Sequence, residues 1–193
     1  MSLSALKFAE DALSAAPVPP MFGTPADLRG ERGSGDVGER GRAVAERAHG
    51  YARRAEAWQR QLAQVEQQLQ TSLAEETREW SDKDRDAALA FLERLASAVD
   101  GHLSLQKTRI ADMERALAGR LGGDREAPAE VDRFLQEQAE RVLQSLRRQH
   151  DRAVEFYYFL LALHAEYDPD ARGGRTFSDP AEFASYMRQQ LKA

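Results

Sequence analysis

Apolar residues between Val44 and Leu69 recur at alternating steps of four and three positions. The members of this set are Val44, Ala48, Tyr51, Ala55, Trp58, Leu62, Val65 and Leu69. Their spacing is that of the a and d positions of a heptad repeat, which share one edge of an α-helix. After Leu69 the pattern continues one position late, at Leu73 and Trp80, which locally relaxes supercoiling. The pattern predicts a helix over about residues 39–80 with one continuous apolar edge.

Two more long helices are predicted downstream. Residues 82–121 carry one apolar stripe, which consists of Ala88, Leu92, Leu95, Val99, Leu103, Gln106, Ile110, Met113, Leu117 and Leu121. The turn at residues 81–84 provides its N-cap, and two glycines at 122–123 end it. Residues 128–167 carry two apolar strips, one with Val131, Leu135, Val142, Leu146, Ala153, Tyr157, Leu160 and His164, the other with Phe134, Phe156, Phe159 and Leu163. Two strips indicate that this helix contacts more than one neighbour.

Shorter elements flank the long helices. Residues 2–16 predict an amphipathic helix with Leu6, Ala9, Leu13 and Ala16 on one side, and the prolines that follow end it. Residues 178–191 predict a short C-terminal helix whose buried edge holds Phe183, Met187 and Leu191. The expected organisation is an amphipathic helix at 1–16, a flexible Gly/Pro-rich linker at 17–40 and a helical bundle domain at 41–193.

Helix lengths and short connections predict the topology. Three helices of about 40 residues are each about 60 Å long, and short connections make consecutive helices antiparallel neighbours. The predicted fold is all-α: an elongated antiparallel bundle of three long helices, with a short C-terminal helix and a tethered N-terminal helix. A turn near Asp82 pairs Tyr51 with Met113, and a turn near Arg125 pairs Leu92 with Tyr158.

Composition limits the classes of function. The 193 residues include no cysteine, which excludes disulfides and thiolate chemistry and fits a cytoplasmic protein. No apolar run approaches the roughly 20 residues of a membrane span. The net charge is −5, and the arginines alternate with acidic residues along the predicted helices. Because nucleic-acid affinity depends on neutralising phosphates, we expect no nucleic-acid partner.

Three short motifs resemble binding sites. Glu46 and His49 match Glu-x-x-His of di-iron bundles, but the chain has no second copy and both point away from the predicted core. The loop at 168–179 has the spacing of a calcium-binding EF-hand loop, yet arginines stand at 172 and 175. Residues 33–38 read G-x-G-x-x-G without the strand that a dinucleotide site requires. We expect no catalytic residues, no metal and no cofactor.

Aromatic residues gather at one end of the predicted bundle, at Trp80, Phe91 and the run 156–159. Three interpretations remain: a core plug, an association surface, or the lining of a small-molecule pocket. The candidate partner-binding residues are Trp80, Phe156, Tyr157, Tyr158 and Phe159, together with Leu6 and Leu13 of the N-terminal helix.

The leading hypothesis is a non-enzymatic bacterial interaction protein: a scaffold, an adaptor or a secretion-associated coiled-coil protein that self-associates, with a homodimer expected. An alternative is a ligand-sensing bundle with a pocket at the aromatic end. The layout of one amphipathic helix before three long helices also resembles BAR-type membrane-curvature proteins, which implies binding to a membrane surface. The polar face of the N-terminal helix is not basic, so a membrane surface is not favoured.

Overall fold

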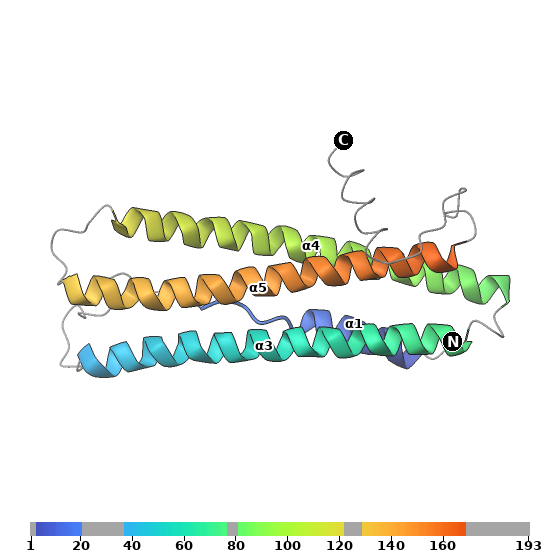
Figure 1. Ribbon diagram of the computed structural model, residues 1–193, viewed down its shortest axis with the longest axis horizontal. Coiled ribbons are helices and arrows are strands. Elements are labelled where there is room, and N and C mark those ends of the chain that lie inside the picture. Colours follow the sequence, from blue (N-terminus) through green and yellow to red (C-terminus); the bar gives the residue numbers. More distant parts are fainter. Residues whose placement is uncertain (1–2, 21–36, 77–80, 122–128, 169–193) are drawn as a thin grey trace. The chain divides into compact units, whose positions relative to one another are not determined.

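The computed structural model describes residues 3–20, 37–76, 81–121 and 129–168 (Figure 1). Its elements are α1 (Leu3–Ser14), α3 (Val37–Glu76), α4 (Asp82–Leu121) and α5 (Ala129–Tyr167). The three long helices pack against each other, which confirms the predicted all-α bundle, and the described residues contain no strand. The predicted C-terminal helix at 178–191 lies outside the described residues. None of the described helices has the length and apolarity that a membrane span requires.

The heptad edge of α3 is the most completely buried feature of the helix. All eight predicted members and Leu73 have between 0% and 4% of their surface exposed. The residues between them are charged or polar in most positions, and those with described side chains are mainly exposed. Since burying one apolar side chain contributes about 1.5–3 kcal/mol, this edge rather than helix propensity holds α3 in place.

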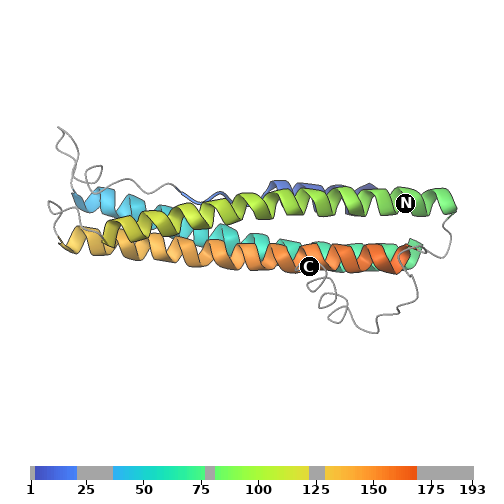
Figure 2. The same cartoon turned by 90° about the horizontal axis from the view of Figure 1, so that it is seen from above.

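The chain divides into two compact units, and each long helix contributes to both. The first unit combines Met1–Ala15, Arg60–Leu103 and Asp151–Ala193, and the second combines Ala16–Gln59 and Ser104–His150. In each unit α3 and α5 run in the same direction and α4 runs in the opposite one (Figures 1 and 2). The chain reverses direction between α3 and α4 and again between α4 and α5. Because of these two reversals, α3 and α5 are parallel.

The first unit contains α1 and parts of the three long helices. In both views α1 lies alongside the parts of α3 and α4 that belong to this unit, on the side away from α5 (Figures 1 and 2). Six apolar residues of α4 are buried here: Ala88, Phe91, Leu92, Leu95, Ala96 and Val99. Phe156, Leu160 and Leu163 of α5 are buried in the same unit.

The register of α4 against α5 differs from the predicted one. Nε2 of His164 lies 3.3 Å from Oε1 of Glu93, and the charge of Asp100 acts on the Tyr157 hydroxyl. These pairings place position 93 opposite position 164, whereas a turn near Arg125 pairs position 92 with 158. The prediction was therefore wrong by about two helical turns. The prediction paired residues at equal distances from the turn near Arg125. The actual register depends on how the side chains of α4 and α5 pack against each other.

The second unit is built around α3 and α5. Its main core cluster holds Ala48, Tyr51 and Ala55 of α3 with Val142 and Leu146 of α5. Ile110 and Met113 of α4 pack against this cluster, in agreement with the predicted neighbourhood of Tyr51 and Met113. A second cluster joins Val44 to Leu135, with Val131 and Phe134 packed against it.

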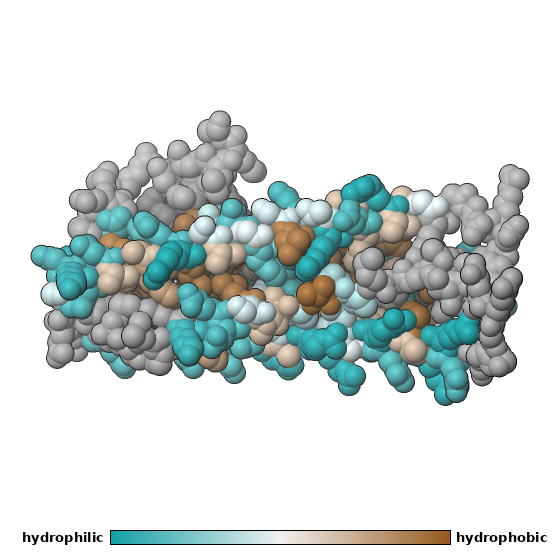
Figure 3. All heavy atoms as spheres, turned by 180° about the vertical axis from the view of Figure 1, so that it is seen from behind, coloured by the Kyte–Doolittle hydropathy of each residue, from teal (hydrophilic) through white to brown (hydrophobic). Residues whose placement is uncertain are grey.

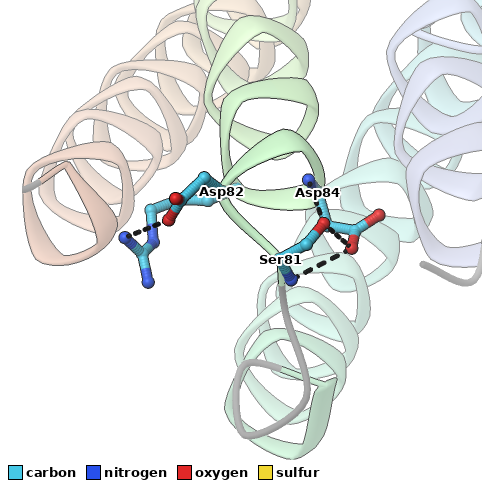
Figure 4. A network of polar contacts seen from close by, with 4 residues as sticks. Ser81, Asp82 and Asp84 are labelled. Atoms are coloured by element: carbon cyan, nitrogen blue, oxygen red, sulfur yellow. Dashed lines mark hydrogen bonds and ion pairs between the residues drawn. The ribbon is translucent and has the colours of Figure 1, made fainter.

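The N-terminus of α4 is fixed by a capping box (Figure 4). The Asp84 carboxylate accepts hydrogen bonds from the backbone N–H of Ser81 at 3.1 Å and from its hydroxyl at 2.5 Å. In return, the backbone N–H of Asp84 donates to Oγ of Ser81 at 3.3 Å. These bonds hold the pKa of Asp84 below its ordinary value. The predicted N-cap is therefore confirmed, with Asp in the place that Glu or Gln usually takes.

Candidate functional site

The aromatic residues of α5 separate into a buried and a half-buried group. Phe156 is fully buried and stacks on Phe159 with ring centroids 6.2 Å apart and planes inclined by 20°. Tyr157 and Tyr158 are half-buried and meet edge to face at 5.9 Å. Phe156 therefore belongs to the core of the first unit, as the core-plug interpretation proposes. Tyr157, Tyr158 and Phe159 remain accessible in part.

The other candidate partner residues are only partly covered by the structure. Trp80 and the side chain of Leu6 lie outside the described residues, and Leu13 is half-buried on α1. Burial, together with the charge of Asp100, raises the pKa of the Tyr157 hydroxyl. This hydroxyl is therefore neutral at physiological pH and can donate a hydrogen bond, but it is not poised as a base.

A chain of buried polar groups crosses the second unit. The hydroxyl of Tyr51 donates to Oε1 of Gln149 at 2.7 Å, and Nε2 of Gln149 donates to the carbonyl oxygen of Pro17 at 3.3 Å. Burial raises the pKa of Tyr51, while the charges of Arg109 and Arg54 oppose that rise. Three segments far apart in sequence are thereby joined by groups that have no access to water.

Gln106 of α4 is a buried polar side chain of a different kind. It is fully buried, and neither its amide nitrogen nor its amide oxygen has a hydrogen-bond partner among the described residues. It occupies a position of the apolar stripe, between Val99 and Ile110. A buried amide without hydrogen-bond partners lowers the free energy of unfolding, so we expect Gln106 to destabilise the core.

The histidines do not gather into a metal site in the described part of the chain. His49 is exposed, and Nη1 of Arg141 lies 2.7 Å from its Nε2, which must act as the acceptor. His164 has Glu93 on one side at 3.3 Å and Asp168 on the other at 4.0 Å. No group of three or more potential metal ligands occurs among the described residues. Apart from Asp168, the calcium-like loop at 168–179 lies outside them.

A solvent-open groove lies in the second unit, between the first turns of α3 and α5. Its volume is about 390 Å³, and its lining is almost entirely apolar. The lining residues are Gly38, Gly41, Arg42, Ala45, Glu130, Val131 and Phe134. A Cβ atom at Gly41 would lie 3.8 Å from Cε1 of Phe134, so small residues on α3 face an aromatic ring on α5. Of these small residues, Gly38 was assigned to the predicted linker at 17–40, whereas α3 already begins at Val37. Gly41 and Ala45 were placed in the predicted bundle domain, without a groove.

Apolar side chains of α4 are poorly covered in the second unit. Ile110, Met113 and Leu117 are half-buried, and Leu105 has 48% of its surface exposed. On the face shown in Figure 3, polar and charged side chains predominate, and apolar side chains show between them in several places. The stripe is therefore buried at Ala88, Leu92, Leu95 and Val99 in the first unit and partly open in the second.

Ion pairs between helices differ in their exposure. Nη2 of Arg152 lies 2.6 Å from Oε2 of Glu66, with only 17% and 22% of the two side chains exposed. Nη2 of Arg147 meets Oε1 of Glu114 at the same distance, but about half of each side chain is exposed. Glu66 raises the pKa of Arg152 against the effect of burial. The first pair links α3 to α5, and the second links α4 to α5.

Comparison of the chain with protein-family models, with curated proteins and with solved structures finds no significant match.

Proposed function

We propose that this chain is a non-enzymatic helical-bundle interaction protein that self-associates, in the manner of a scaffold or adaptor. The observation that carries the proposal is the partly open apolar stripe of α4 in the second unit. Ile110, Met113 and Leu117 follow one face of the helix, and each is half-buried. Leu105, which is 48% exposed, points about 120° away from this face around the helix. Half-buried apolar side chains along one helix face are typical of a surface that another helix covers.

The buried state of α1 supports a protein partner over a membrane surface. Ala9 and Ala12 of α1 have no exposed surface, so its apolar face is already occupied. The exposed side carries Lys7 with two acidic neighbours and lacks the basic character of an interfacial helix.

Sedimentation equilibrium of the full chain tests this proposal. We expect a homodimer at micromolar concentration, and we expect Leu117→Glu to weaken it at least about tenfold, since a charge is then buried at the interface. Ala111→Glu is the matched control, because it adds the same charge at an exposed position of the same helix. A monomer at every concentration, or equal effects of both variants, would overturn the proposal.

A second candidate function is ligand sensing, which the groove between α3 and α5 supports. A volume of about 390 Å³ lies within the range of pockets that hold small organic molecules. The groove is distinct from the aromatic residues 156–159, where a pocket was expected from the sequence. A rise in melting temperature with an apolar ligand that Ala45→Trp abolishes would support this function. No shift with any member of a metabolite set would remove it.

A further inference from the structure

The α1 helix packs into the first unit with small side chains on its buried face. Ala9 and Ala12 are fully buried, whereas Lys7, Glu10 and Ser14 of the same helix are exposed. Alanines at i and i+3 let the backbone of α1 approach its neighbours closely, but they bury little apolar area. The geometry of this contact is therefore well defined, while its strength is modest.

The α1 helix also depends on docking for its existence. It spans 12 residues, and isolated helices of this length are marginal in water. Elements that make few apolar contacts open at lower free energy than the core around them. We therefore expect a minor population of molecules in which the surface that α1 covers is exposed.

Of the residues that directly follow α1, Pro17 is held against the rest of the protein, and Val18 is exposed. Pro17 is buried, and its carbonyl oxygen accepts the hydrogen bond from Gln149, whereas Val18 is 61% exposed. Sixteen residues with four glycines separate Pro20 from Val37. A segment of this length reaches at most about 55 Å, which is enough to bring α1 to a neighbouring molecule.

We propose that α1 is exchanged between two copies of this chain. In the dimer, α1 of each copy lies on the first unit of the other copy and makes there the contacts it otherwise makes on its own chain. The proposal rests on the self-association proposed above and names the element that is shared. A second copy is the occupant that fits, because it supplies the same alanine face. Reciprocal exchange closes a two-fold dimer, and the half-buried face of α4 proposed above adds the contacts that favour this dimer over docking on the same chain.

The covalent test uses the few lysines of the chain. Lys7 of α1 and Lys83 of α4 both belong to the first unit, and both are exposed. Full-length protein with natural isotopes is mixed with ¹⁵N-labelled protein at high concentration, because docking on the same chain has an effective concentration in the millimolar range. The dimer is then isolated, treated with an amine cross-linker and digested for mass spectrometry.

Exchange predicts that about half of the cross-links between Lys7 and Lys83 in the dimer join a light to a heavy peptide, since random mixing makes half of the dimers hybrid. Cross-links that join only peptides of the same isotope would overturn the exchange. If the dimer itself persists in that case, the proposed self-association stands and only the exchange fails. If no dimer forms, both proposals fail.

Variants separate exchange from simple contact between neighbouring molecules. Ala12→Glu places a charge on the buried face of α1, and we expect the dimer fraction to fall at least about tenfold. Ser14→Glu adds the same charge on the exposed face and leaves the dimer unchanged. Circular dichroism confirms that the long helices persist in both variants. An Ala12→Glu protein that dimerises like the Ser14→Glu protein would contradict the exchange.

Discussion

The hydroxyl of Tyr51 on α3 donates a hydrogen bond of 2.7 Å to Oε1 of Gln149 on α5, and both side chains are fully buried. The same glutamine donates to the carbonyl oxygen of Pro17. Polar groups that satisfy each other inside an apolar core disfavour other registers, because any slip leaves them unpaired. The pair therefore fixes α3 against α5 in the second unit and ties the residue that follows α1 to both.

Replacing either member of this pair destabilises the protein. Tyr51→Phe leaves Oε1 of Gln149 buried without a donor, and Gln149→Leu leaves the Tyr51 hydroxyl and the Pro17 carbonyl unpaired. We expect each variant to lower the free energy of unfolding by about 1–3 kcal/mol in urea titrations. The double variant loses less than the sum of the two, because no partner remains unsatisfied between positions 51 and 149.

Tyr157→Phe is the control for this cycle. Tyr157 is half-buried, and no hydrogen bond of its hydroxyl is found among the described residues, so a change within about 0.5 kcal/mol is expected. Strict additivity of the Tyr51 and Gln149 variants would show that the bond contributes nothing to the fold.

We expect alkaline pH to lower the free energy of unfolding, because the buried phenol of Tyr51 resists ionisation in the folded state. Burial raises the pKa of the folded-state phenol above its ordinary value, so the unfolded chain ionises first as the pH rises. The contribution of Tyr51 to the free energy of unfolding is complete below about pH 10. Above that pH it declines by up to about 1.4 kcal/mol per pH unit. The advantage of the wild type over Tyr51→Phe in urea titrations should therefore shrink by about 1.4 kcal/mol at pH 11.

Other tyrosines titrate in the same range, because burial also raises the pKa of Tyr157 and of Tyr167. The difference between the wild type and Tyr51→Phe removes their common contribution. A difference that stays constant from pH 8 to pH 11 would mean that the phenol of Tyr51 is accessible to water in the folded protein.

Removing the amide of Gln106 should stabilise the protein. The side chain is fully buried, and neither amide atom has a hydrogen-bond partner among the described residues. Leucine has a similar volume and no polar atoms, so Gln106→Leu is expected to raise the free energy of unfolding by about 1–3 kcal/mol. Gln149→Leu is the same substitution at a partnered glutamine and should have the opposite sign. A loss of stability in Gln106→Leu would reveal a bound water or another partner for the amide.

Gly101 offers a second stabilising substitution. It lies inside α4 on an exposed position, and a Cβ atom there would meet nothing within 4 Å. The space around this position is therefore open to a methyl group. Gly101→Ala should raise the free energy of unfolding by about 1 kcal/mol, because alanine restricts the unfolded chain and favours the helix.

Gly50→Ala is the comparison for this variant. Its Cβ atom would lie 3.3 Å from Nη1 of Arg54, so the arginine must move and the gain should be smaller. If thermal or urea unfolding shows no gain for Gly101→Ala, the position is not helical in solution.

Spacing along the chain was enough to predict the three long helices and the buried edge of α3. For α1 it identified Ala9 but missed Ala12, while the predicted Leu13 and Ala16 are only half-buried. The steps of three and four from Val44 to Leu69 identify the buried edge of α3 residue by residue, because helical geometry converts spacing into direction. The N-cap at residues 81–84 could be predicted for the same local reason, whereas the reciprocal bonds between Ser81 and Asp84 were seen only in the structure.

How the helix faces meet could not be predicted from the spacing of residues along one helix. The register of Glu93 against His164, the partner of the Tyr51 hydroxyl and the groove beside Phe134 depend on contacts between residues distant in sequence. The burial of Ala9 and Ala12 is of the same kind, since a periodic pattern shows that a helix has an apolar face without showing which surface covers it. Packing of complementary side chains makes that choice, and spacing along one helix carries no information about its partner.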